Sequence, residues 1–406
     1  MLGKMKVVSF THFVQGPAAG QYLADMGAEV IKIEPLNGAF ERSYGPANVF
    51  VDGISATYAS VNRNVRSVAV DLKAPGSSDV VARLIETADV VLENYRGGVL
   101  DRLGFGYEAV KAIKPDIIYA SASGWGGGGP MKDEPGQDLL IQGRCGLISV
   151  TGDMETVAAV PGVPIVDVHG AALMAMAICA AYIRKLTTGE GTRIESNLLS
   201  AGLDLQGESM SGYFSGKLGQ DWVRRDGRLA SWFLPAPYGV FRLSDCHAVL
   251  SLGGGVDGFA QAIGDEELIG LAADRMENRD AIMRRLGIVL ADWTYERLDR
   301  ALAPLKMWYS RVQTYDDLLT DPQIVHNGSF GSIPISTGQE FTVLNHPVSY
   351  DGALPPLRHF AETPGADTRR ILEGLGFPAE EIDRLAAENV IRCSSGRIAD
   401  ISEGMA

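Results

Sequence analysis

Asp167 is the carboxylate whose position stands out for chemistry, in the segment VPIVDVHG directly before a long apolar run. The run at 170–183 predicts a buried helix that begins near Gly170. A carboxylate beside the free N–H groups of a helix start is favoured in its ionised form. Position alone favours an N-cap, because Asp is a preferred capping residue. The apolar neighbours favour a second interpretation, since a partly desolvated carboxylate suits a nucleophile.

Basic residues form two groups despite the negative total charge. Arg63, Arg66 and Lys73 surround the third predicted strand, and Arg96 and Arg102 follow the fourth. Near strand ends, these side chains would hold a phosphorylated ligand by charge and by forked hydrogen bonds. Each arginine alone is typical of a solvated surface, and the groups together predict a rim for an anionic ligand.

Two glycine clusters are further candidates for ligand binding. Gly124, Gly126 and Gly129 match the dinucleotide pattern G-x-G-x-x-G after a predicted strand, but Pro130 follows and no helix is predicted there. Phosphate binding needs such a loop to run into a helix start, so a flexible loop is favoured. Glycines 253–255 end a predicted strand before a helix near Asp257. Two interpretations remain for these glycines: a loop whose backbone amides face a ligand, or an ordinary turn between a strand and a helix.

The sequence contains no metal-binding or hydrolase motif. Its six histidines show no HExxH or similar spacing, and no G-x-S-x-G nucleophile elbow occurs. Its four cysteines lie far apart without a CxxC pair, which favours a reducing compartment. We therefore expect no catalytic metal.

The composition argues against several classes of partner. Of the 406 residues, 36 are Lys or Arg and 50 are Asp or Glu, which gives a formal net charge of −14. Nucleic acids and anionic membranes are bound mainly by clustered Lys and Arg, so neither is expected as a partner. The apolar run at 170–183 is shorter than the roughly 20 residues that cross a bilayer. The start of the chain does not resemble a secretory leader, so a cytoplasmic protein is expected.

The first two hundred residues alternate short β-branched runs with helical segments. The predicted strands are 6–10, 29–34, 67–71, 90–94 and 117–121, and the predicted helices are 18–26, 78–87 and 107–113. This alternation predicts a parallel sheet with helices on both faces, which binds ligands at the carboxyl ends of its strands. After Gly202, a stretch rich in Gly, aromatic residues and Arg predicts a junction to a smaller α+β domain. Further strands are predicted at 238–242, 248–252 and within 329–349, and helices within 257–302, 368–375 and 379–388.

Four segments of the chain together resemble family III CoA-transferases, the group that contains formyl-CoA transferase and carnitine CoA-transferase. The segments are GPAAGQYLADMGAEVIKIEP, NRNVRSVAVDLK, VLENYRGGVLDRLGFGYE and TGEGTRIESNLLSA, and the similarity covers essentially the whole chain. It implies an interlocked, ring-like homodimer of α/β subunits, each with a Rossmann-like parallel-sheet large domain and a smaller α+β domain. The implied organisation is a large domain from 1–202 and 346–406, a small domain at 231–315, and linkers at 203–230 and 316–345 that thread through the partner.

The resemblance also implies a nucleophile, an aspartate between a PGYD-like segment and the long apolar helix, where Asp167 stands. The Asp167 carboxylate would attack the acyl-CoA thioester to give a mixed anhydride, which CoA converts to an aspartyl-CoA thioester. A carboxylic acid is then activated by the same steps in reverse, so two moderate barriers replace direct transfer between poorly reactive carboxylates. For the binding of CoA, the resemblance implies that the Tyr95 ring stacks on adenine and that Arg102 binds a phosphate group. The implied CoA contacts are Val14, Gln15, Val70, Leu72, Lys73, Asn94, Tyr95, Arg96, Arg102 and Gln137.

The chain departs from the family pattern at several positions. Pro35 stands where some members have an arginine that helps to hold the nucleotide, and Gln137 takes the aromatic position of the PGYD segment. The glycine-rich loop of formyl-CoA transferase has no obvious counterpart before the predicted strand at 238–242. The segments YFSG at 213–216 and PAPYGVFR look closer to the carnitine CoA-transferase branch.

Three other functions remain as alternatives. The superfamily also contains α-methylacyl-CoA racemases, whose catalytic histidine corresponds to Gln137, and glutamine cannot exchange a proton. His169 would then be the substitute base. A nicotinamide dehydrogenase and a non-catalytic CoA-binding protein rank below the racemase. No residue identifies the acid, and Arg224, Arg225 and Arg228 fit either a second substrate carboxylate or a solvated surface.

Overall fold

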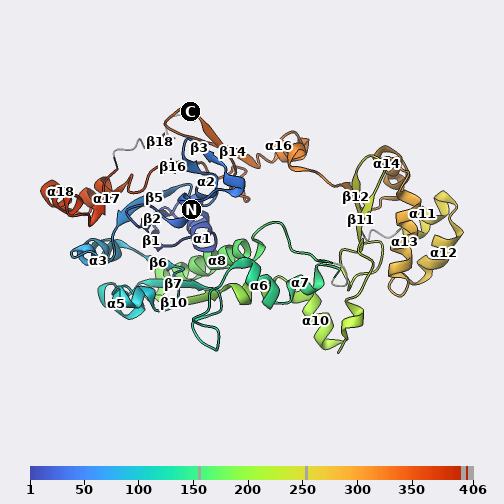
Figure 1. The fold of residues 1–406 in the computed structure, drawn as a ribbon, viewed down its shortest axis with the longest axis horizontal. Coiled ribbons are helices and arrows are strands. Elements are labelled where there is room, and N and C mark those ends of the chain that lie inside the picture. The colour runs from blue at the N-terminus through green and yellow to red at the C-terminus, as the bar shows by residue number, and fades with distance from the viewer. Residues whose placement is uncertain (154–156, 252–254, 395–398, 401–406) are drawn as a thin grey trace. The chain divides into compact units, whose positions relative to one another are not determined.

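The computed structural model describes residues 1–153, 157–251, 255–394 and 399–400 (Figure 1). The chain divides into two compact units. The first comprises Met1–Ile141, Val163–Leu205 and Pro322–Ala406, and the second comprises Gln142–Gly162 and Gln206–Asp321.

The second unit includes a segment that the sequence analysis placed in the large domain. Residues 142–162 leave the first unit within helix α6 (Asp138–Arg144) and are bound by the second unit through hydrogen bonds. The Gln206 amide donates to the Cys145 carbonyl at 3.1 Å, and the Arg225 guanidinium donates to the Val150 carbonyl at 2.8 Å. The predicted large-domain segment 1–202 therefore includes residues 142–162, which belong to the second unit in the structure.

The first unit is built on a seven-stranded sheet with the order β10-β7-β6-β1-β2-β5-β17. Six strands run parallel, and β17 pairs antiparallel with β5 at the edge. The prediction of a parallel sheet is confirmed, whereas β17 is too short to show a period in the sequence. The strands are β1 (Lys6–Phe10), β2 (Glu29–Glu34), β5 (Val65–Val70), β6 (Val90–Glu93), β7 (Ile118–Ser123), β10 (Thr192–Asn197) and β17 (Ile391–Arg392).

The strand order reverses at β1, which lies between β2 and β6. On one side of β1 the chain builds β2 and β5, and on the other it builds β6, β7 and β10. In a doubly wound sheet of this order, ligands bind outside the carboxyl ends of the strands where the order reverses. The loops after β1 and β6 therefore flank the expected ligand site.

Helices cover both faces of the sheet (Figure 1). One face packs against α1 and α8, through a core that includes Leu23 and Met174, and the opposite face packs against α3, α5, α17 and α18. Both faces of the strands are therefore buried, which explains apolar runs such as VVSF and VVLE. The helices are α1 (Gln15–Asp25), α3 (Ser77–Thr87), α5 (Tyr107–Ile113), α8 (Ile165–Thr188), α17 (Thr368–Gly374) and α18 (Ala379–Ala387).

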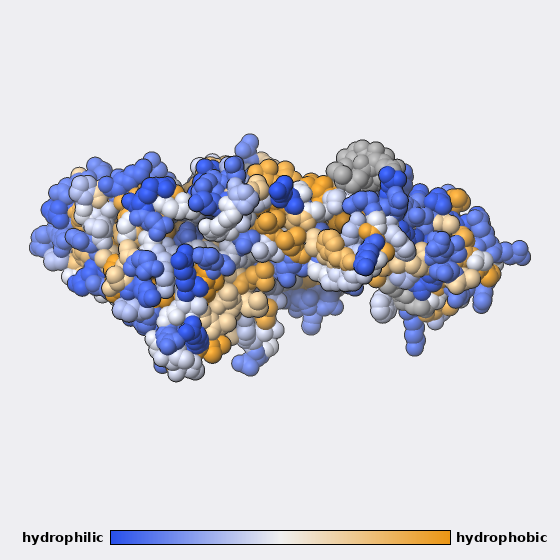
Figure 2. All heavy atoms as spheres, turned by 90° about the horizontal axis from the view of Figure 1, so that it is seen from below, coloured by the Kyte–Doolittle hydropathy of each residue, from blue (hydrophilic) through white to orange (hydrophobic). Residues whose placement is uncertain are grey.

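Helix α8 differs from the prediction at its start and in its burial. It begins at Ile165, so Asp167 lies in its first turn instead of before it. One side packs against α1 and the sheet, while Val168, Met176 and Ile183 on the other side are exposed. By length and composition this 24-residue helix could cross a membrane, and 44% of its most apolar stretch is buried in the structure. Exposed apolar residues are seen as orange patches on the molecular face in Figure 2.

A hairpin near the C-terminus of the first unit occupies a segment that was expected to be a linker. It consists of β14 (Phe330–Pro334) and β15 (Glu340–Leu344). Its Ile333 and Phe341 pack against Tyr58 of helix α2 (Ala56–Val61). The linker prediction for 316–345 is therefore wrong for these residues, because their alternating apolar side chains complete a core cluster.

The smaller elements of the first unit connect these layers. The loop after β2 contains the 3-10 helices η1 (Phe40–Arg42) and η2 (Pro46–Asn48) and the hairpin of β3 (Phe50–Val51) and β4 (Ile54–Ser55). The others are α4 (Val99–Arg102), α9 (Leu198–Asp204), α16 (Pro322–His326) and the strand pair β16 (His359–Phe360) and β18 (Ala399–Asp400).

The second unit is an α+β structure with its own core. A three-stranded antiparallel sheet packs with helices through residues such as Phe241, Phe259 and Leu286. Of the glycines at 253–255, the first two lie outside the described residues, and Gly255 directly precedes α11. The strands are β8 (Gly152–Asp153), β9 (Val157–Ala158), β11 (Gly239–Arg242), β12 (His247–Leu250) and β13 (Tyr309–Arg311). The helices are α7 (Leu147–Val150), α10 (Gly207–Ser215), η3 (Gln220–Trp222), α11 (Val256–Ile263), α12 (Glu266–Leu271), η4 (Ala272–Asp274), α13 (Arg279–Leu290), α14 (Tyr295–Leu302), η5 (Ala303–Leu305) and α15 (Tyr315–Leu318).

Candidate active site

The loops after β1 and β6 are fastened to each other where the strand order reverses. The Asn94 side chain accepts a hydrogen bond from the His12 N–H and donates one to the His12 carbonyl, each 2.9 Å long. A Cβ at Gly16 would come within 2.8 Å of the Asn94 side chain, so glycine leaves room for this contact. Asn94 therefore positions the loop that leads into α1.

Gln15 begins α1, and its amide lies against helix α8. The residue is 4% exposed, and its Nε2 has no hydrogen-bond partner among the described residues. A Cβ at Gly170 would lie 2.7 Å from this Nε2, so glycine lets the amide approach the α8 backbone. Asp167 lies one turn earlier on the same side of the helix, because residues three apart are neighbours there. A buried hydrogen-bond donor without a partner costs about 1–3 kcal/mol of folding free energy. Such an unpaired donor is typical of a side chain that binds a ligand.

Asp167 is not the cap of its helix. Asp138 Oδ2 accepts hydrogen bonds from the backbone N–H groups of Val166 at 2.8 Å and of Asp167 at 3.1 Å. These are groups that a helix start leaves unpaired, so Asp138 caps α8 from a distant position in the sequence. The N-cap interpretation of Asp167 is therefore wrong. Within the part of the chain that the structure describes, no hydrogen bond or ion pair engages the Asp167 carboxylate.

The surroundings of Asp167 favour its neutral form more than water would. Burial, and secondarily the negative charge of Asp138, raise the pKa of Asp167 to about 7. Burial raises the pKa of the Tyr44 phenol, and the negative charges of Glu41 and Asp167 raise it further. Asp167 is thus a weakly solvated carboxylate that is free to react, which is the state a nucleophile needs.

Some of the predicted CoA contacts come together in the structure. Val14, Gln15, Asn94 and Tyr95 lie on the two fastened loops or next to them, and Arg96 is exposed directly after Tyr95. The Tyr95 ring lies 5.1 Å from the His12 ring, centroid to centroid, and so belongs to the same surface.

The other predicted contacts are more dispersed. Val70 ends β5 with its side chain in the core, so only its backbone could meet a ligand. Leu72 is half-buried and Lys73 is exposed, both just beyond the carboxyl end of β5. Arg102 is exposed on α4, and Gln137 is exposed beside the capping Asp138.

Two members of the predicted basic rim have other roles. Arg63 is buried and donates to both carboxylate oxygens of Asp25 and, at 2.6 Å, to the Leu344 carbonyl. Arg66 lies at the start of β5, whereas Lys73 follows the end of that strand. The direction of a strand places residues before and after it on opposite edges of the sheet. The rim prediction is therefore wrong for Arg63 and Arg66.

A buried ion pair beneath the loop after β1 was not predicted. Lys32, in the middle of the apolar strand β2, pairs with Glu41. The other Glu41 oxygen accepts a hydrogen bond from the Phe13 N–H at 3.2 Å. The sequence does contain a signal for this pair, because Lys32 interrupts the apolar run EVIKIE of a strand that is buried on both faces. A buried charge requires a partner.

The histidine that the racemase alternative would use as its base is paired with a carboxylate in the structure. His169 Nε2 lies 2.8 Å from Asp204 Oδ2, so its ring is engaged with a residue of α9. Gln137 is exposed and carries no proton to exchange near neutral pH. Among the described residues, no group of three or more His, Cys, Asp or Glu side chains is arranged to hold a metal ion.

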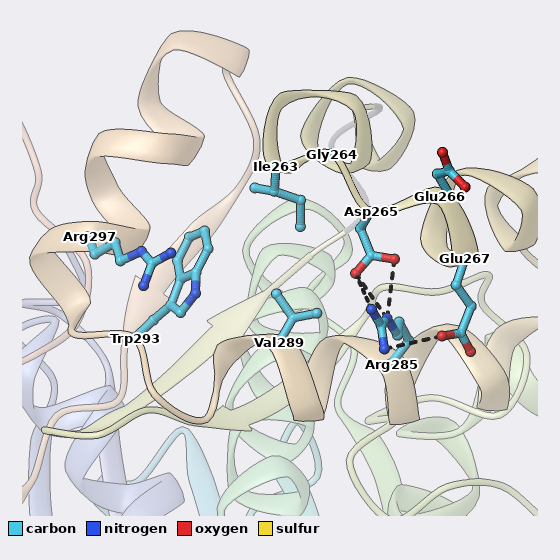
Figure 3. Close-up of a pocket in the computed structure, with 9 residues that line it drawn as sticks. All are labelled: Ile263, Gly264, Asp265, Glu266, Glu267, Arg285, Val289, Trp293 and Arg297. Carbon is cyan, nitrogen blue, oxygen red and sulfur yellow. Dashed lines mark hydrogen bonds and ion pairs between the residues drawn. The ribbon is translucent and has the colours of Figure 1, made fainter.

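A separate pocket lies within the second unit (Figure 3). It has a volume of about 520 Å³. Its Arg285 pairs with Asp265 at 2.8 Å and with Glu267 at 3.1 Å, and Arg297 lies 4.1 Å from the centre of the Trp293 ring. The positive charge of Arg285 is thus matched by carboxylates of the same pocket.

Comparisons with known proteins identify the family of the chain. Residues 2–368 match the family described as CoA-transferase family III. The chain is 30% identical over 404 residues to succinyl-CoA:glutarate CoA-transferase of Mus musculus, which covers 95% of this chain and 89% of that protein. It is also 30% identical over 403 residues to succinate–glutarate CoA-transferase of Agrobacterium fabrum, with 95% and 97% covered.

The solved structures include a similar fold. A crystal structure of a CaiB/BaiF family protein from Brucella suis matches with a TM-score of 0.78 and 29% identity, and covers 92% of this chain and 99% of that one. The sequence match extends over most of the chain, and the fold agrees with it. The chain belongs to CoA-transferase family III.

Proposed function

We propose that this CoA-transferase moves CoA from an acyl-CoA to a carboxylic acid through covalent intermediates on Asp167. The observation that carries the proposal is the unengaged, partly buried Asp167 carboxylate in the first turn of α8. Its helix is capped by Asp138, so the nucleophile need not leave a structural contact before it reacts. The unpartnered Gln15 amide lies one turn away and supplies a hydrogen-bond donor.

The proposed reaction balances without water, metal or redox chemistry. The Asp167 carboxylate attacks the thioester carbonyl, and the C–S bond breaks. CoA leaves as thiolate, and a mixed anhydride of Asp167 and the acyl group remains. The thiolate then attacks the Asp167 acyl carbon, which gives an aspartyl-CoA thioester and releases the donor acid as carboxylate. The acceptor carboxylate attacks the carbonyl of this thioester, its C–S bond breaks, and a second anhydride forms with release of CoA thiolate. CoA thiolate attacks the acceptor carbonyl, which yields the new acyl-CoA and restores the Asp167 carboxylate.

The Gln15 amide is proposed to stabilise the negative charge that develops at Asp167. Each addition step turns a carbonyl oxygen into an oxyanion, and fixed N–H donors at such a position are worth several kcal/mol of transition-state stabilisation. Nε2 is a buried donor with no partner in the described protein, so it can bind the oxyanion without breaking an internal bond. Burial of the site also protects the anhydrides from hydrolysis.

CoA is proposed to bind at the fastened loops after β1 and β6. Val14, Asn94 and Tyr95 border this edge, and Arg96 offers an exposed positive charge for phosphate. Lys73 and Arg102 are exposed cations beyond the carboxyl end of β5 and on α4. The position agrees with the rule that doubly wound sheets bind ligands where their strand order reverses.

The subunit is proposed to form a homodimer through the uncovered side of α8. Val168, Met176, Ile183 and Leu186 are exposed there, at spacings that place them along one side of the helix. A second copy would bury this apolar stripe, as in the interlocked dimers implied by the resemblance. Met176→Asp should shift the mass measured by light scattering from dimer to monomer, whereas Ile288→Asp on α13 should leave the dimer intact. A monomeric wild-type protein would exclude the proposal.

Covalent trapping tests the role of Asp167. Purified protein is incubated with acyl-CoA donors, treated with hydroxylamine or borohydride, and analysed by intact-protein and peptide mass spectrometry. We expect a modification at Asp167 that Asp167→Ala abolishes. Asp257→Asn is the matched control, because Asp257 is an exposed aspartate in the first turn of another helix, α11. Modification at another residue, or none with any donor, would overturn the covalent route.

A further inference from the structure

We propose that the acyl group transferred at Asp167 is apolar or aromatic and carries no second carboxylate, because a continuous run of aromatic side chains leads toward this residue. The proposal rests on the proposed function and names the substrate class of that site. The aromatic run consists of Tyr95, His12, Phe13, Phe40 and Tyr44.

Consecutive rings of the aromatic run contact one another. The centroid distances are 5.1 Å from Tyr95 to His12, 4.8 Å from His12 to Phe13, 4.7 Å from Phe13 to Phe40, and 5.2 Å from Phe40 to Tyr44. All four lie in the range of favourable aromatic pairs. The run joins the loops after β6, β1 and β2, so three segments build one surface.

The middle of the aromatic run is open to a ligand. Phe13 is 45% exposed and Phe40 is 52% exposed, although large aromatic side chains gain most from burial. Phe13 has a backbone φ of 63°, in the left-handed region that non-glycine residues rarely adopt. Its N–H donates to buried Glu41 at 3.2 Å, which holds the loop in this conformation. The protein thus fixes an exposed aromatic surface at a cost in backbone strain.

The two ends of the aromatic run suit the two parts of an acyl-CoA. The exposed Arg96 follows Tyr95 and offers a positive charge to the phosphates of CoA. The other end continues from Phe13, which lies two residues before Gln15, and the Gln15 amide lies against α8 one turn from Asp167. A thioester bound along the run would therefore place its CoA part near Tyr95 and its acyl group near Phe40 and Tyr44.

The cations beneath the aromatic run are already neutralised. Lys32 is buried and pairs with Glu41. The Arg42 guanidinium donates to both carboxylate oxygens of Glu34, at 2.8 and 2.9 Å, and to Tyr58 at 2.6 Å. A second substrate carboxylate needs a free cation or several donors, and its desolvation against aromatic rings without one is costly. An apolar acyl group gains from the same surface.

Isotope exchange measures the acyl preference without knowledge of the natural pair of acids. Full-length wild-type protein is incubated with an acyl-CoA and the ¹³C-labelled free acid of the same acyl group, and label in the thioester is followed by mass spectrometry. Benzoate, hexanoate and succinate are the three probes. We expect kcat/KM for benzoate or hexanoate exchange to exceed that for succinate by at least about tenfold, the scale on which a few buried apolar groups discriminate.

Variants at Phe40 connect the preference to the aromatic run. Phe40→Ala is expected to lower the ratio of benzoate to succinate exchange about tenfold, Phe40→Leu to retain part of it, and Phe40→Arg to favour succinate by pairing with its second carboxylate. Phe214→Ala is the control, because Phe214 is an exposed phenylalanine of α10 in the second unit. Unchanged thermal unfolding of each variant shows that folding is intact.

The outcomes separate this proposal from the proposed function. Faster exchange of succinate than of both apolar acids, or an exchange ratio that Phe40→Ala leaves unchanged, would overturn the substrate class while CoA transfer stands. No exchange with any acid together with no modification of Asp167 would overturn the proposed function itself. Faster exchange of an apolar acid, with a ratio that falls in Phe40→Ala and not in Phe214→Ala, supports both.

Discussion

Asp167→Asn is expected to stabilise the folded protein, and to do so only at higher pH. Burial raises the pKa of Asp167 to about 7 from an ordinary 3.8, so ionisation costs more in the folded state than in the unfolded chain. One pH unit of such a difference corresponds to about 1.4 kcal/mol, which gives an upper bound of about 4 kcal/mol. Asp167 is partly exposed, and solvent screening reduces the expected effect to about 2–3 kcal/mol.

The sign follows from which state holds more protons. Between about pH 4 and pH 7 the folded state keeps a proton on Asp167 that the unfolded chain has lost, so the stability of the wild type falls as pH rises through this window. Asparagine has no proton to lose and escapes this fall. The two proteins should be equally stable near pH 4, and the variant more stable by about 2–3 kcal/mol near pH 8.

Urea unfolding of the wild type, Asp167→Asn and Asp257→Asn across this pH range measures the effect. The slope with denaturant should agree between the proteins, so that the midpoints report stability. Asp257→Asn should follow the wild type, because Asp257 is exposed. An equal gain at low and high pH, or no gain at high pH, would refute the conclusion that the fold holds a desolvated carboxylate at position 167.

Three further predictions concern the residues around Asp167, the proposed nucleophile. Asp138→Asn keeps an oxygen to cap α8 and removes a negative charge, so the pH midpoint of Asp167 labelling should fall, whereas Asp138→Ala should also lose about 1 kcal/mol of stability in urea unfolding. Gly170→Ala places a Cβ 2.7 Å from the Gln15 amide, so the labelling rate should fall about tenfold or more while circular dichroism shows an intact fold. Lys32→Met leaves buried Glu41 without its cation and should cost about 3–5 kcal/mol in urea unfolding, and a loss below about 1 kcal/mol would contradict the burial of this pair.

Five of the seven strands of the large sheet were predictable because their patterns are local, whereas β10 and β17 were not predicted. Strands β1 and β2 and helix α5 have the predicted bounds, since apolar β-branched runs and helical spacing each lie within a few residues. The start of α8 was not predictable in the same way. The segment VPIVDV before residue 170 is rich in β-branched residues and contains Pro164. The side chain that caps the helix and lets it begin at Ile165 comes from Asp138 in another segment.

The burial of Asp167 was predictable from the sequence, and the arrangement of the residues around it was less so. The apolar context indicates a desolvated carboxylate at Asp167, but spacing alone cannot show that a distant carboxylate has taken the capping role. Arg63 and Arg66 are basic residues near a strand in the sequence. In the structure, Arg63 is paired with Asp25, and Arg66 lies at the opposite end of the strand from the site. The aromatic surface of Phe13 and Phe40 joins residues from separate loops, and no sequence period connects them.

The pair Asp138 and Asp167 explains why one helix start can be both stable and reactive. A single carboxylate at the start of α8 would accept hydrogen bonds from the unpaired N–H groups, which would stabilise the anion and make it less nucleophilic. Here Asp138 accepts those hydrogen bonds, and its charge together with burial raises the pKa of the neighbouring Asp167. The carboxylate that stabilises the helix is thus a different residue from the proposed nucleophile. A change at Asp138 should therefore shift the pH dependence of labelling, whereas a change at Asp167 removes labelling and relieves the cost of burial.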